Sequence, residues 1–138
     1  MMPADLHRYE DDATIPNHAQ LWRRIPPKHL VPDKNRGGIR ISKAAFDDHP
    51  NGTPMSVVLG DDVLASGRAP SSIIAGHDGF CLASVTAALA RSLNQGIARR
   101  PLAEEPAHAE VFGKKTQAVR KAFAREAVWV IGPGVGSA

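Results

Sequence analysis

Short runs of alternating or β-branched side chains recur along the chain and predict strands. Residues 21–25 (LWRRI) and 108–113 (HAEVFG) alternate between positions on opposite faces, and residues 55–59 (MSVVL) are rich in β-branched side chains. Further short strands are predicted at 39–41 (IRI), 97–102 (IARRPL, an edge strand because of its proline) and 128–131 (VWVI). Because glycine and proline clusters separate these runs, they predict a small sheet with short connections.

A helical spacing of apolar residues predicts a core helix over residues 82–93. The apolar stripe consists of Leu82, Val85, Leu89 and Leu93. If this helix packs on the predicted strands, an aspartate at Val85 or Leu89 should prevent folding, since an unpaired buried charge is costly.

A second helix is predicted after Thr116, whose hydroxyl is suited to cap a helix N-terminus. Its inward face would consist of Val119, Ala122, Phe123 and Ala127. The whole pattern predicts an α+β protein, a single domain in which a five- or six-stranded, mainly antiparallel sheet packs on two main helices. The domain is expected to span residues 21–131, with a flexible N-terminal arm at 1–20 and a flexible tail at 132–138.

The composition is that of a globular protein. Hydrophobic residues make up 43% of the 138 positions and charged residues 22%. Cys81 is the single cysteine, which excludes an internal disulfide, and no histidine pair has the i, i+4 spacing of a helical metal site. We therefore expect no metal and no cofactor. No apolar run approaches the roughly 20 residues that span a membrane, and no signal peptide is evident, so a cytoplasmic location is expected.

The net charge of +3 conceals four alternating blocks. Residues 1–20 carry a net charge of −3, residues 21–43 of +6, residues 44–98 of −3 and residues 99–138 of +3. If the two basic blocks are adjacent in the fold, they form a surface that attracts phosphate groups. If they remain apart, each is only a solvated face.

Gly113, Lys114, Lys115 and Thr116 form a turn that leads into the predicted last helix. A helix N-terminus presents free amide groups to an anion, and two lysines would add positive charge. This turn is one candidate phosphate site. The alternative is a solvated helix start capped by Thr116.

His108 and Glu110 share one face of the strand before that turn. A histidine within reach of a bound phosphate can act as a general acid or base, which makes both residues catalytic candidates. The alternative is a histidine that is hydrogen-bonded on a half-buried strand.

A second candidate phosphate site combines Arg23, Arg24, Arg40, Ser42 and Ser56. An arginine guanidinium can contact a phosphate through two hydrogen bonds, and a serine can orient a ribose hydroxyl. Arg40 is also a catalytic candidate at this site. The alternative is that the arginines only cover the surface and that Ser42 only caps a turn.

Several segments resemble a group of small bacterial proteins of unassigned function. The shared features are the arginine strand, the turn RISKAAF, the strand PMSV and the segment EPAHAEVFGKKT. The resemblance covers residues 21–131 and implies a bacterial domain, but it implies no activity.

The order of an arginine strand, the segment GGIR and a strand of small residues also resembles the RES-type toxins. These toxins belong to the ADP-ribosyltransferase-like folds and consume NAD. In this comparison Arg23 or Arg24 matches the first arginine of the family, Arg40 the second and Glu110 the late acid. The family's tyrosine has no counterpart, because position 56 is serine.

These observations leave three functional classes open. The first is a phosphate-binding domain, including a toxin-type enzyme that acts on RNA or a nucleotide. The second is a non-catalytic nucleic-acid-binding module that uses the basic blocks. The third is a protein-interaction or accessory domain, as a homodimer or with a partner protein. Convergence of Arg40 and His108 in one cleft would favour the enzyme.

Overall fold

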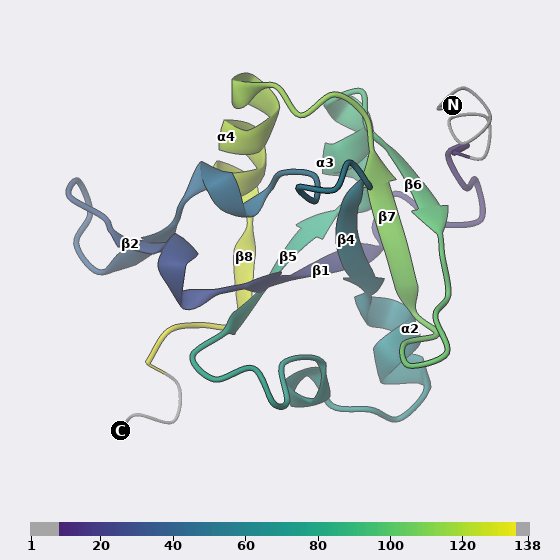
Figure 1. The fold of residues 1–138 in the computed structure, drawn as a ribbon, viewed down its shortest axis with the longest axis horizontal. Helices are drawn as coiled ribbons and strands as arrows, with labels where there is room; N and C mark the ends of the chain where they lie inside the picture. Colours follow the sequence, from purple (N-terminus) through teal and green to yellow (C-terminus); the bar gives the residue numbers. More distant parts are fainter. Residues whose placement is uncertain (1–8, 135–138) are drawn as a thin grey trace.

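A six-stranded antiparallel sheet and a separate two-stranded hairpin dominate the computed structural model, which describes residues 9–134 (Figure 1). The strands are β1 (Gln20–Ile25), β2 (Leu30–Pro32), β3 (Ile39–Ile41), β4 (Met55–Leu59), β5 (Cys81–Thr86), β6 (Gly96–Arg99), β7 (His108–Phe112) and β8 (Val128–Ile131). The helices are α2 (Gly60–Ala65), α3 (Ala87–Ser92) and α4 (Gln117–Glu126), with short 3₁₀ helices η1 (Pro27–His29), η2 (Lys43–Ala45) and η3 (Pro70–Ile73). The predicted α+β class with an antiparallel sheet is confirmed.

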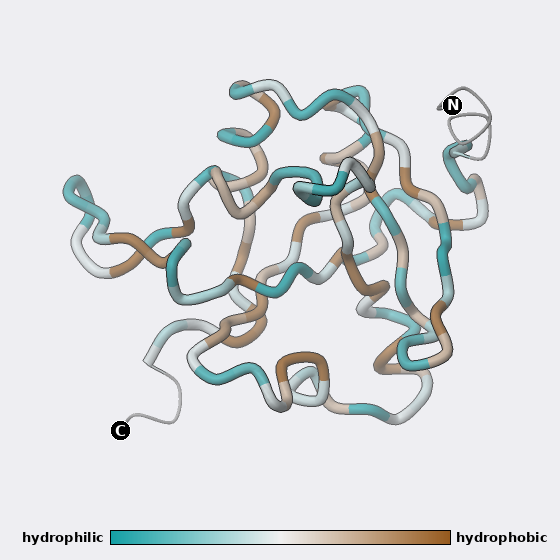
Figure 2. Tube along the Cα trace, in the orientation of Figure 1, coloured by the Kyte–Doolittle hydropathy of each residue, from teal (hydrophilic) through white to brown (hydrophobic). Residues whose placement is uncertain are grey.

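The sheet has the order β6-β7-β4-β1-β5-β8, and β2 pairs with β3 alone. Every neighbouring pair in the sheet is antiparallel. Alternation fixes which side chains enter the core: on β7, Ala109 and Val111 are fully buried, while His108, Glu110 and Phe112 are half-buried. This is the facing that the sequence predicted. Figure 2 shows hydrophobic segments within the strands of the sheet and a hydrophilic tip on the β2–β3 hairpin.

The short helix η2 and the long helix α4 pack on each other through two aromatic rings. The Phe46 and Phe123 rings are stacked at 5.7 Å between centroids, and neither residue is exposed to solvent. Val119 and Ala122 complete the buried face of α4, as predicted. Ala127, also predicted on that face, follows the helix as its C-cap residue and is half-buried. The outer face of α4 is therefore held beside η2 and the hairpin.

The predicted helix over residues 82–93 is wrong in its first half. Residues Cys81–Thr86 form strand β5, between β1 and β8, and only residues Ala87–Ser92 are helical. The five residues 81–85 are all buried, because β5 is covered on both faces. Such a strand lacks the usual alternation of buried and exposed side chains. The spacing of Leu82, Val85 and Leu89 therefore matches that of a helix only by chance. The hydroxyl of Thr86 accepts a hydrogen bond from the Leu89 amide and starts α3.

The predicted flexible arm also differs from the structure over its described part. Ile15 is 1% exposed and belongs to the core. The Asp12 amide donates to the Ile97 carbonyl at 2.8 Å, and the Ile97 amide donates to Asp11 at 2.9 Å. The acidic residues of the first block thus attach this segment to β6. Residues 1–8, and residues 135–138 of the predicted tail, lie outside the described residues.

Within residues 9–134, no helix combines the length and the apolar character required to cross a bilayer.

Candidate functional site

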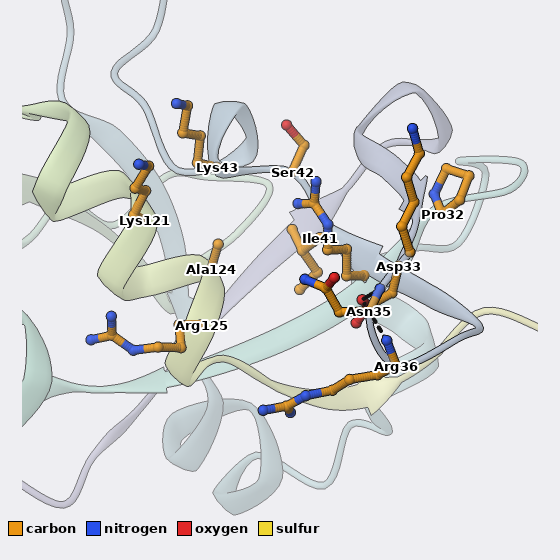
Figure 3. A pocket seen from close by; sticks show the side chains of 12 residues that line it. Pro32, Asp33, Asn35, Arg36, Ile41, Ser42, Lys43, Lys121, Ala124 and Arg125 are labelled. Atoms are coloured by element: carbon orange, nitrogen blue, oxygen red, sulfur yellow. Dashed lines mark hydrogen bonds between the residues drawn. The ribbon is translucent and has the colours of Figure 1, made fainter.

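The candidate site residues line two separate cavities. The first, which we call the basic groove, lies between the β2–β3 hairpin, η2 and α4 and has a volume of about 790 Å³ (Figure 3). Its lining residues are Pro32, Asp33, Lys34, Asn35, Arg36, Arg40, Ile41, Ser42, Lys43, Lys121, Ala124 and Arg125. The second, which we call the His108 cavity, has a volume of about 1130 Å³. Its lining residues are Tyr9, Asp48, Asn51, Gly52, Thr53, Pro54, Arg99, Arg100, Pro101, Leu102, His108, Glu110, Phe112, Gly113 and Lys114.

The hairpin loop forms one wall of the basic groove. The Asp33 carboxylate accepts hydrogen bonds from the amides of Asn35, at 3.0 Å, and Arg36, at 3.1 Å. Gly37 and Gly38 follow with φ angles of 77° and 75°, a conformation that favours glycine. The acid of this wall is therefore engaged by the loop backbone, and the lysine and arginine side chains of the loop are exposed.

Strand β3 and η2 form the floor of the groove. Arg40 is exposed on β3, and the half-buried Ser42 caps η2 by accepting a hydrogen bond from the Ala44 amide at 3.2 Å. The predicted capping role of Ser42 is confirmed. The Phe46–Phe123 contact then places Lys121 and Arg125, on the outer face of α4, across the groove.

The basic groove carries a strong excess of positive charge. Among residues 9–134, six cationic side chains line it, and Asp33 is the only acid that does so. Five of the six form no ion pair within residues 9–134; the sixth, Arg125, pairs with Glu126 at 3.1 Å. These cations come from residues 34–43 and 121–125, one group from each basic block of the sequence. The two basic blocks therefore meet in the fold.

Arg23 and Arg24, predicted to bind phosphate, do not line this groove. The Arg23 guanidinium donates to the carbonyls of Ala45, at 3.0 Å, and Ser56, at 2.7 Å. Burial lowers the pKa of Arg23 to about 10. Arg24 donates to the Ile73 carbonyl at 2.7 Å. Both arginines thus bind main-chain carbonyls of the protein itself.

The two lysines of the predicted phosphate-binding turn have different surroundings. The Lys115 side chain is 2% exposed; it donates to the carbonyls of Val111 and Gly113 and pairs with Asp48 at 2.9 Å. Burial lowers the pKa of Lys115, although Asp48 opposes the shift. Lys114 is exposed and lines the His108 cavity. Of the two ammonium groups, only that of Lys114 is exposed to solvent.

The remaining residues of that turn shape the backbone. Gly113 has a φ of 136°, a conformation that favours glycine, and a Cβ atom there would lie 2.7 Å from the Gln95 side-chain oxygen. The Thr116 hydroxyl accepts a hydrogen bond from the Val119 amide at 3.2 Å and caps α4. The capping alternative for Thr116 is thereby confirmed.

His108 is held by two hydrogen bonds at the wall of its cavity. Its Nδ1 lies 2.8 Å from the Arg100 carbonyl oxygen, and its Nε2 lies 3.2 Å from the Ser56 hydroxyl. Glu110 accepts a hydrogen bond from the Tyr9 hydroxyl at 2.8 Å and pairs with Arg100 at 3.7 Å. Burial and the neighbouring Glu110 raise the pKa of Tyr9.

The three catalytic candidates are divided between the two cavities. His108 and Glu110 line one cavity, and Arg40 lines the other. The convergence of Arg40 with His108, which would have favoured an enzyme acting on phosphate, is not observed. Within residues 9–134, no three histidine, cysteine or acidic side chains gather into a group that could hold a metal ion.

Most cations of the groove were not predicted as site residues from the sequence. The cations not singled out are Lys34, Arg36, Lys43, Lys121 and Arg125. The alternating charge blocks of the sequence identified the two basic segments that carry these cations. They did not show that the two segments lie side by side in the fold.

The chain matches no protein-family model, no curated protein and no solved structure in comparisons with known proteins.

Proposed function

We propose that the protein binds nucleic acid through the phosphate backbone of a strand lying in the basic groove. The observation that carries this proposal is the meeting of two distant basic segments around one groove. The only acid among its described lining residues, Asp33, is engaged by loop amides. Such a surface attracts phosphates and gains affinity by releasing the counterions condensed on them.

The use of the other arginines supports this proposal. Outside the groove, Arg68 pairs with Glu105, Arg91 with Asp11, and Arg99 with both Asp12 and Asp62. In the groove, five cations have no acidic partner within residues 9–134. Five like charges in one place repel one another, and a polyanion relieves that repulsion.

The lining of the groove favours a polymer over a single nucleotide. None of the described residues that line the groove is aromatic, so they offer a base no ring on which to stack. The cations span a hairpin, a 3₁₀ helix and an α-helix, which suits several consecutive phosphates. Binding is therefore expected to be independent of sequence, with RNA and single-stranded DNA sharing the same backbone chemistry.

Fluorescence anisotropy with a labelled single strand of roughly 12 nucleotides tests this proposal. The double variant Arg40→Ala/Lys121→Ala removes one cation from β3, at the floor of the groove, and one from α4. It should weaken binding about tenfold, which corresponds to the loss of two exposed phosphate contacts.

The matched control is Lys28→Ala/Lys114→Ala, which removes the same charge from exposed lysines outside the groove. The control should change the affinity less than twofold, by roughly the long-range effect of net charge alone. Equal weakening by the two double variants would mean that the affinity follows net charge and not the groove.

A further inference from the structure

Ser56 is hydrogen-bonded to His108, which lines the His108 cavity. The Ser56 hydroxyl lies 3.2 Å from Nε2 of His108, and the Ser56 side chain is exposed to solvent. This separation is that of a nucleophile and its general base in an enzyme without bound substrate.

The second hydrogen bond of His108 fixes its tautomer. A carbonyl oxygen only accepts, so the 2.8 Å contact with the Arg100 carbonyl requires the proton on Nδ1. In the neutral ring, Nε2 is then an acceptor and receives the hydrogen bond from Ser56. The main-chain carbonyl thus orients the imidazole as the third group of a catalytic triad does.

From this geometry we propose that Ser56 is a nucleophile for acyl transfer, with His108 as its general base. The role is distinct from nucleic-acid binding, since Ser56 and His108 do not line the basic groove. It also differs from general acid–base catalysis at a bound phosphate, because the reacting group is the serine oxygen.

The strand register holds the pair in place. On β4 and β7, Ser56 faces Glu110 and Val58 faces His108, so all four side chains emerge on the same face of the sheet. The carbonyl of Ser56 accepts a 2.7 Å hydrogen bond from Arg23, which anchors the nucleophile's backbone. Because both residues belong to strands, the pair is held more rigidly than loop residues would be.

The walls of the His108 cavity indicate the substrate class. Pro54, Pro101, Leu102 and Phe112 supply apolar surface, and Leu102 is 41% exposed. These side chains suit a short apolar acyl group. We assign the substrate as a carboxylic ester with such an acyl chain.

The reaction follows from these positions. The Ser56 oxygen attacks the ester carbonyl carbon while its proton moves to Nε2 of His108, which becomes an imidazolium. The ester bond then breaks, and the alcohol leaves with the proton from Nε2. Water next attacks the acyl-serine, His108 accepts the water's proton and returns it to Ser56, and the carboxylic acid is released.

A fluorophosphonate probe tests the nucleophile directly, because it labels an activated serine without requiring turnover. Peptide mass spectrometry of the labelled protein should locate the adduct on Ser56. Ser56→Ala should abolish the label, and His108→Gln should slow labelling about 100-fold, the usual size of a general-base contribution. The controls Ser71→Ala and His18→Gln, at other exposed positions, should label as the parent does.

A second measurement tests the pairing in a different chemistry. A cysteine placed by Ser56→Cys should react with iodoacetamide at least tenfold faster than one placed by Ser71→Cys, and His108→Gln should remove the difference. Cys81 does not interfere, because it is 4% exposed. The proposal would be overturned if the probe did not label Ser56, or if it labelled Ser56 as fast in His108→Gln as in the parent. Equal reactivity of the two introduced cysteines would do so as well.

Discussion

Lys115 keeps its ammonium group inside the protein, whereas its neighbour Lys114 is exposed. The Lys115 group joins the end of β7 to Asp48 and satisfies two main-chain carbonyls. It contacts the protein itself, so two adjacent lysines that look equivalent in the sequence have different surroundings. At the scale of single residues, burial decides which charges are free for a ligand.

Replacing these two lysines should therefore have unequal effects on stability. Lys115→Met leaves Asp48 without its partner and two carbonyls without a donor, and should lower the unfolding free energy by about 2–3 kcal/mol. Lys114→Met should change it by less than about 0.5 kcal/mol. Urea denaturation of both variants measures the contrast. Similar small losses in both would mean that Lys115 is as exposed as Lys114.

Glu105 makes the free energy of unfolding depend on pH. Two hydrogen bonds from Arg68, at 2.9 and 2.7 Å, lower the pKa of Glu105 below its ordinary value of 4.5, although burial opposes the shift. A carboxyl group with a lowered pKa in the folded state contributes stability above its unfolded pKa. That contribution is lost as the pH falls through the folded pKa.

The variant Glu105→Gln removes this contribution. The parent should be more stable than Glu105→Gln near neutral pH, and the difference should shrink as the pH falls below about 4.5. Urea midpoints at about pH 6 and about pH 3 measure it. Because other carboxyl groups titrate alike in both proteins, their effects cancel. A difference that stays constant with pH would show that the Arg68 contact does not shift the Glu105 pKa.

At the scale of elements, β5 is the part of the fold that a single sequence hides best. Both faces of β5 are buried from Cys81 to Val85, Ser84 included, so no alternation of exposed and buried positions marks the strand, and the helix α3 continues directly from it. The alternating strands β1 and β7 and the β-branched strand β4 were found from their pattern, because local residue order determines it. Residues 81–86 form a strand because they pair with β1 and β8, and this pairing is not visible in the local sequence.

The strand assignment changes what substitutions in this region should do. Val85 is 3% exposed on β5, so Val85→Asp should prevent folding: an unpaired buried carboxylate costs several kcal/mol against a total stability of about 5–15 kcal/mol. Leu89 is only half-buried, in the first turn of α3, where an acid is tolerated. Leu89→Asp should fold and lose about 1–2 kcal/mol.

Circular dichroism during thermal unfolding measures both variants. If residues 82–93 formed a core helix, both variants should be unfolded. Because residues 81–86 form strand β5, only the Val85→Asp variant should be unfolded. A cooperatively melting Val85→Asp protein would contradict the burial of β5.

At the scale of the whole molecule, charge and topology together produce the groove. The basic blocks were visible in the sequence, but their meeting depends on the Phe46–Phe123 contact, between residues 77 positions apart. Of the predicted phosphate-binding residues, Arg40 and Ser42 line the groove, while Arg23, Arg24 and Lys115 contact the protein itself. Local sequence does not distinguish these roles, because long-range packing decides which cations remain unpaired.

The central claim is that this groove binds nucleic acid through phosphates, and the salt dependence of binding tests it most directly. Between about 50 and 200 mM salt, four to six phosphate contacts predict a slope of log affinity against log salt of about −3 to −4 for a single strand. Arg40→Ala/Lys121→Ala should make the slope shallower by about 1.4 units, and Lys28→Ala/Lys114→Ala should leave it unchanged. No binding at low salt, or a slope unaffected by the groove variant, would contradict the claim.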